Sequence, residues 1–158
     1  MAEKDNLQKL KENYEKLRKK YNLPEFDKLD DEFEIREIDY DLNLVREIKR
    51  LVSSRLLYIS DLLDPILNPH ESLRSSIESN AVSEDDINEM VRFYKEIWHL
   101  LHVGANASFI SDDEEAKYIN DIVARWPKIK AKVKYFSDKL IIAWSQAEKD
   151  DAPSHYTG

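Results

Sequence analysis

The chain has 158 residues and a formal net charge of −8, with 42% hydrophobic and 35% charged residues. A chain of this length fits one domain and can bury a core without disulfides. It contains no cysteine, which excludes zinc fingers and cysteine catalysis. Its two glycines are Gly104 and Gly158, so we do not expect a glycine-built phosphate loop or dinucleotide turn.

The sequence begins with Met1 and runs directly into charged side chains, so we expect no secretory signal or transit peptide. Its apolar runs are a few residues long, far short of the roughly 18–20 residues that cross a bilayer. We therefore expect a cytoplasmic protein that has no membrane partner. The absence of cysteine agrees with this location but does not establish it.

The first predicted element is an amphipathic helical arm over residues 1–22. Its apolar stripe recurs at alternating steps of three and four residues and consists of Leu7, Leu10, Tyr14, Leu17 and Tyr21. The arm ends before Pro24, because the residue before a proline is pushed toward an extended conformation. Two heptads are marginal alone, so the stripe packs either on the body of its own chain or against a copy of itself.

Residues 23–40 are acidic and irregular, and we predict an acidic wrapping connection that is extended apart from one short helical turn. Phe33, Glu34 and Ile35 alternate like a strand, but no second strand-like run exists to pair with them, so a sheet is not expected. The acids between residues 27 and 37 are interleaved with large apolar residues. We favour a solvated wrapping segment here, with docking on a basic partner groove as the alternative.

We predict a helical bundle over residues 41–149. Its first helix has Asp41 as the expected N-cap and carries the strongest apolar band of the sequence. The band covers two adjacent faces, which predicts a central helix with several neighbours. Pro65 interrupts this helix, because proline lacks the amide that the helix needs. The chain is then expected to bend.

A short helical stretch with Leu73 and Ile77 follows, and residues 75–80 are predicted to form a loop. Ser83 and Ser111 then each precede a run of acidic residues and open a helix, since carboxylates in the first turn face the positive end of the helix dipole. We assign these acids to capping and solubility.

Gly104 is the expected stop of the helix that Ser83 opens. In the helix that Ser111 opens, Pro127 either begins a new helix or kinks a continuous one. Each tryptophan lies on an apolar stripe and is expected to pack in the core. These residues are Trp98, Trp126 and Trp144.

Together, these elements predict an all-α protein. We predict a helical bundle of four to six helices, partly antiparallel, with the N-terminal amphipathic arm. Residues 150–158 have no apolar pattern and are expected to be a disordered tail.

Glu96, His99 and His102 suggest a metal-binding helical bundle as one alternative function. The E-x-x-H spacing of the first two is the one that di-iron bundles use, and the two histidines could share a divalent ion with a carboxylate from another helix. The chain has no second E-x-x-H, and a histidine pair near a helix C-terminus explains the same residues. We therefore expect no cofactor.

Arg125, Lys128, Lys132 and Lys139 share one face of the last predicted helix and suggest weak nucleic-acid binding as a second alternative. The overall acidity and the lack of a nucleic-acid motif weigh against it. We therefore do not expect a nucleic-acid partner.

No serine stands in a nucleophile elbow, so the sequence does not indicate an enzyme. Our leading hypothesis is a non-enzymatic protein-interaction or self-association module. Its partner is a protein or a second copy, and a homodimer joined along the apolar stripe of the arm is the form we expect.

Overall fold

The structure is a computed structural model that describes residues 2–150, and every regular element in this part is helical. The elements are α1 (Ala2–Tyr21), α2 (Phe26–Phe33), the 3-10 helix η1 (Ile35–Glu37), α3 (Leu44–Leu67), α4 (Leu73–Asn80), α5 (Glu84–Ala107) and α6 (Asp112–Asp150). The predicted all-α bundle is confirmed. The predicted disordered tail lies, apart from Asp150, outside the described residues.

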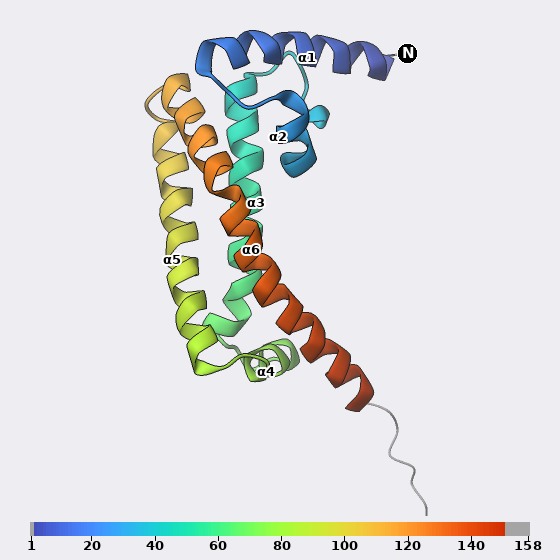
Figure 1. Cartoon of the computed structure of the whole chain (residues 1–158), viewed down its shortest axis with the longest axis vertical. Coiled ribbons are helices and arrows are strands. Elements are labelled where there is room, and N and C mark those ends of the chain that lie inside the picture. The colour runs from blue at the N-terminus through green and yellow to red at the C-terminus, as the bar shows by residue number, and fades with distance from the viewer. Residues whose placement is uncertain (1, 151–158) are drawn as a thin grey trace, which may run out of the picture.

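Three long helices form the body of the molecule (Figure 1). Helices α3 and α6 run in one direction and α5 runs in the other, so the bundle is partly antiparallel as predicted. Helix α1 lies across the end where α3 and α6 begin, and α4 lies at the opposite end. Helix α6 has 39 residues against 24 in each of α3 and α5, a difference of about 22 Å at 1.5 Å per residue.

The apolar band of α3 forms the centre of the core, as its width predicts. Side chains from all three long helices meet there and are almost completely buried, and each contributes about 1.5–3 kcal/mol to folding. They include Ile48, Val52 and Leu56 from α3, Met90, Phe93 and Ile97 from α5, and Ile119 and Ile122 from α6.

Both predicted serine caps are confirmed. The Ser83 hydroxyl accepts a hydrogen bond from the Asp86 amide at 3.2 Å, and the Asp86 carboxylate accepts one from the Ser83 amide at 3.1 Å, which completes a capping box. The Ser111 hydroxyl accepts a hydrogen bond from the Glu114 amide at 3.3 Å. The start of each helix is therefore encoded locally.

The predicted boundaries of α3 are wrong at both ends. The N-cap is Asn43 rather than Asp41, because the Asn43 side chain stands close enough to accept a hydrogen bond from the Arg46 amide at 3.2 Å. Pro65 does not end the helix, which continues past it. Ile66 is 4% exposed, so packing against the core outweighs the one hydrogen bond that proline removes.

Residues 75–80 are not a loop but most of helix α4. The Ser72 hydroxyl caps this helix by accepting a hydrogen bond from the Ser75 amide at 3.1 Å. Its two large apolar residues, Leu73 and Ile77, are too few to reveal the helical period in the sequence. The position of α4 beside α6 is therefore set by tertiary contacts.

The connection over residues 23–40 is more ordered than predicted, since it contains the eight residues of α2 and the turn η1. Glu34 has a φ of 57° and turns the chain between them, so the strand-like alternation around it forms no strand. The Asp30 carboxylate accepts hydrogen bonds from the Arg36 amide at 2.8 Å and from its Nε at 2.6 Å. Although burial raises the pKa of Asp30, these hydrogen bonds bring it below its ordinary value.

Helix α6 passes through Pro127 without a break, which selects the continuous helix of the two alternatives. Trp126, which precedes the proline, and Ile129, two positions after it, are buried in the core. Burial of these neighbours holds the helix together where the proline amide is missing.

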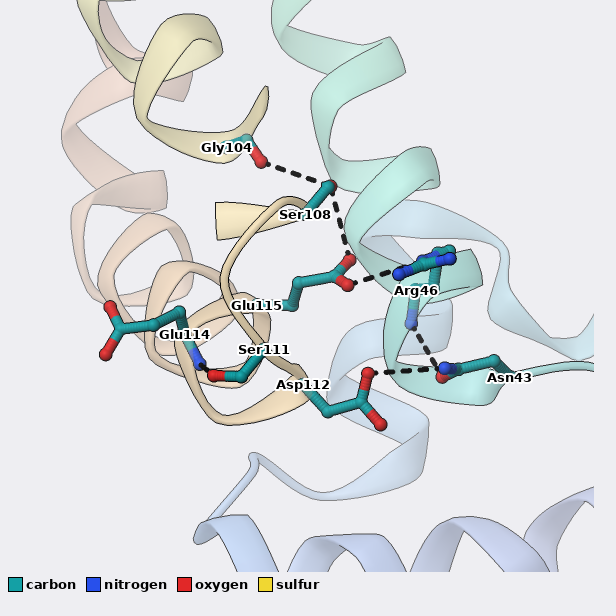
Figure 2. A network of polar contacts seen from close by, with 8 residues as sticks. All are labelled: Asn43, Arg46, Gly104, Ser108, Ser111, Asp112, Glu114 and Glu115. Carbon is teal, nitrogen blue, oxygen red and sulfur yellow. Dashed lines mark hydrogen bonds and ion pairs between the residues drawn. The ribbon is translucent and has the colours of Figure 1, made fainter. Parts of the chain in front are cut away.

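A polar network joins the start of α3, the end of α5 and the start of α6 (Figure 2). Glu115 is fully buried, and its carboxylate accepts hydrogen bonds from Arg46 Nε at 3.4 Å and from the Ser108 hydroxyl at 3.5 Å. Beside it, the Asn43 amide donates to the Asp112 carboxylate at 3.3 Å. Acids of the first turn of α6 therefore connect helices, in addition to the capping and solubility that we assigned to them.

Gly104 lies inside α5 and is not its stop, since the helix ends at Ala107. A Cβ at this position would lie 2.6 Å from Cζ of the Tyr118 ring on α6. Glycine is therefore required here for the close approach of α5 and α6.

Gly104→Ala should lower the free energy of unfolding by about 1–3 kcal/mol, because the added methyl group overlaps the Tyr118 ring. This would reverse the usual effect in helix interiors, where alanine is about 1 kcal/mol more favourable than glycine. Urea denaturation of Gly104→Ala, Tyr118→Leu and the double variant measures the coupling between the two positions. We expect the double variant to lose less than the two single losses together, and additive losses would contradict the close contact.

Candidate functional site

The apolar stripe of the arm, predicted to bind a partner, packs on its own chain. The Tyr14 hydroxyl donates a hydrogen bond to the Pro24 carbonyl at 2.5 Å, and its ring meets the Phe26 ring edge-on with centroids 5.4 Å apart. Two members of the stripe are buried and three are partly buried against the core: Leu10 and Tyr14, then Leu7, Leu17 and Tyr21. The first of the two alternatives therefore holds, and the stripe is not available as a free dimer seam.

The residues of the metal hypothesis do not form a metal site. Glu96 pairs with Lys132 at 3.0 Å, and His99 and His102 are exposed. Residues 2–150 contain no group of three histidine, aspartate or glutamate side chains that could hold a metal ion. The histidine pair is accordingly a surface feature of α5.

Most of the basic face proposed for nucleic acid is neutralised by carboxylates of the same chain. Lys128 is exposed on this face. The ion pairs of the other three residues are Arg125 with Asp121 at 3.1 Å, Lys132 with Glu96 at 3.0 Å and Lys139 with Asp86 at 2.5 Å. Phosphate binding depends on free positive charge, so this geometry does not favour it.

A hollow with a volume of about 740 Å³ lies between α4 and the C-terminal half of α6. We call it the α4–α6 hollow. Its wall is mostly apolar and includes Leu62, Leu73, Ile77, Leu140, Ile141 and Trp144. Ile141 is 63% exposed, so this apolar surface is open to solvent.

A second hollow of about 290 Å³ lies between α3 and α6. We call it the α3–α6 hollow, and its wall includes Tyr58, Ile59 and Val133. Ser137 lines both hollows, so they meet at this residue of α6. We call the surface formed by the two hollows the α6 groove.

A buried carboxylate stands in the wall of the α4–α6 hollow. Glu78 is 4% exposed, and its Oε1 accepts hydrogen bonds from Trp144 Nε1 at 3.0 Å and from Arg74 Nε at 3.3 Å. Its Oε2 is buried and has no hydrogen-bond partner among residues 2–150. This oxygen is an unsatisfied buried acceptor, which is unfavourable for folding.

The core prediction for the tryptophans holds for Trp126, which is buried and donates from Nε1 to Glu32 at 2.8 Å. Trp98 is half-buried on α5. Trp144 is 40% exposed and stands in the groove wall instead of the core. The sequence holds a signal for this outcome, because Ile141, Ile142 and Trp144 point in different directions around the helix and cannot all face one core.

Comparison of the chain with protein-family models, with curated proteins and with solved structures gives no match. Within residues 2–150, no helix is both long enough and apolar enough to cross a membrane. The cytoplasmic location stays a prediction.

Proposed function

We propose that this chain is a non-enzymatic self-association module whose contact surface is the α6 groove. The observation that carries the proposal is the exposed apolar stretch of α6 around Ile141, which borders a hollow of about 740 Å³. Contiguous apolar surface of this kind is typical of protein interfaces. An occupant of the groove must therefore bring an apolar face of its own.

A second copy of the chain meets this requirement through α6 itself. The C-terminal part of α6 runs past α4 and leaves the body of the bundle (Figure 1). Two copies can therefore place these ends side by side without moving another helix. Such a contact uses the same surface on both copies, which is the usual geometry of a dimer with two-fold symmetry.

We propose no catalytic role for the groove because of the residue types that line it. The groove is lined mostly by aliphatic and aromatic side chains with six charged residues, and its two serines, Ser137 and Ser145, are not accompanied by a histidine in the lining. A serine nucleophile needs a base within hydrogen-bond reach. The groove is better suited to binding than to nucleophilic catalysis.

Ile141→Glu should convert the dimer into a monomer, because the new carboxylate would be buried in an apolar contact. We expect sedimentation equilibrium over a concentration series to give about twice the chain mass of 18.7 kDa for the wild type and the single chain mass for the variant.

Ile142→Glu is the matched control. Ile142 is the next residue, is 57% exposed and is not part of the hollow wall, so this variant should remain dimeric. A monomeric wild type at every concentration would refute the proposal. An equal effect of the two substitutions would show that the groove is not the contact surface.

A further inference from the structure

The two hollows of the α6 groove carry opposite charge. The α4–α6 hollow contains Glu78 and Glu148 and no basic residue. The charged residues of the α3–α6 hollow are Arg55, Lys130, Lys134 and the single acid Asp138. Because the hollows adjoin at Ser137, the groove has an acidic end and a basic end with apolar residues between them.

A groove with this charge distribution is complementary to itself only when the two copies run in opposite directions. A two-fold axis near Ile141 places the basic end of one copy over the acidic end of the other. Lys134 and Glu148 lie equally far from Ile141 along α6, separated from each other by about 21 Å at 1.5 Å per residue. Ser137 and Ser145 also lie symmetrically about Ile141, and these small side chains let two helices approach closely.

Building on the proposed self-association, we infer that the occupant of the groove is α6 of a second copy in antiparallel orientation, with Lys134 of each copy paired with Glu148 at the acidic end of the other. The contact buries Ile141 of both copies at its centre. Each dimer contains this lysine site twice.

Lys134 is the basic residue that is most readily available for this contact. Its only ion pair among the described residues is with Asp138 at 2.8 Å, one turn along the same exposed helix face, and pairs of this kind are weak. The other two bases of the hollow are held by acids of the α2 region. These pairs are Arg55 with Glu34 at 3.1 Å and Lys130 with Glu32 at 2.7 Å.

Glu148 supplies the acceptor that this lysine needs. It lines the α4–α6 hollow and is exposed, so its carboxylate is accessible to the ammonium group of a second copy. Glu78 is 4% exposed and already accepts hydrogen bonds from Arg74 and Trp144. It therefore adds negative charge to the wall of the hollow but does not bind the lysine directly.

Charge reversal tests this orientation. Lys134→Glu and Glu148→Lys should each weaken self-association at least about tenfold, because each places like charges together at both lysine sites of the dimer. An equimolar mixture of the two variants should associate with nearly the wild-type Kd, since every contact then joins opposite charges. Sedimentation velocity of each variant and of the mixture, at low salt, measures these constants.

Two further variants serve as controls. Lys128→Glu makes the same change of charge on α6 outside the groove, so its Kd should stay at the wild-type value. Glu78→Gln preserves the volume of the side chain but removes the charge, and it should weaken association several-fold. Circular dichroism verifies that each variant is folded.

The outcomes separate the two proposals. If Ile141→Glu dissociates the dimer but neither charge reversal changes the Kd, the antiparallel lysine contact is refuted and self-association through the groove stands. If each reversal weakens the dimer and the mixture does not restore it, the inferred pairing between copies is also refuted. A wild type that is monomeric throughout refutes both proposals.

Discussion

Asp86→Ala should lower the free energy of unfolding by about 3 kcal/mol at pH 7, because it removes one member of a largely buried ion pair. The Asp86 carboxylate is 9% exposed and binds Lys139 Nζ at 2.5 Å. It also accepts hydrogen bonds from the Tyr135 hydroxyl at 2.9 Å and from the amide and hydroxyl of Ser83. Urea denaturation measures the loss.

The same carboxylate makes the stability depend on pH. The hydrogen bond from Lys139, supported by those from Ser83 and Tyr135, holds the pKa of Asp86 well below its usual range despite burial. The carboxyl group of an aspartate in the unfolded chain titrates at about pH 4. The stabilisation that Asp86 provides is therefore fully present above that pH and is lost as the pH falls toward the pKa of the folded state. We expect the stability of the wild type to fall more steeply than that of Asp86→Ala below about pH 4.

Glu114→Ala is the control for this prediction. Glu114 pairs with Lys117 at 2.6 Å on the exposed face of α6, and pairs of this kind contribute about 0.5 kcal/mol or less. Equal losses for the two variants, or parallel stability curves in acid for the wild type and Asp86→Ala, would contradict a special role of Asp86.

Tyr14→Ala should cost about 3–5 kcal/mol, the range for removing a large buried aromatic side chain. Burial also raises the pKa of the Tyr14 hydroxyl, which keeps it protonated as the donor to Pro24. Helix α1 is further joined to the body, since Asn120 Nδ2 donates to the Tyr21 carbonyl at 3.2 Å. We therefore expect thermal unfolding to remain a single transition at a lower temperature.

Tyr14→Phe keeps the ring and removes the hydroxyl, so its loss should be limited to about 1 kcal/mol. Calorimetry of the two variants separates packing from hydrogen bonding. If Tyr14→Ala released α1 in a separate early transition and left the main transition unchanged, α1 would be an independent arm.

The helices themselves could be predicted because each carries a local signal. The serine caps at Ser83 and Ser111 and the apolar period of α3 depend on residues that are close in sequence. The wrong predictions at Pro65 and Gly104 have a common physical cause. They follow from the backbone preferences of proline and glycine, whereas packing against neighbouring helices determines the structure at both positions.

The groove could not be predicted, because its parts come from distant segments. Glu78 and Trp144 are 66 residues apart and meet only when α4 lies beside α6. The apolar period of α6 continues unchanged from Leu140 to Trp144, so the sequence does not show where the helix leaves the core. Only the surplus of large apolar residues around Ile141 indicates a surface in need of a partner.

Helices α1 and α4 lie at opposite ends of the body (Figure 1). In the proposed dimer, two copies that meet at their α4 ends would hold their N-terminal helices at the far tips of an elongated particle. Such a particle would present two identical outer surfaces, so a molecule that recognises the N-terminal helix would encounter a bivalent target.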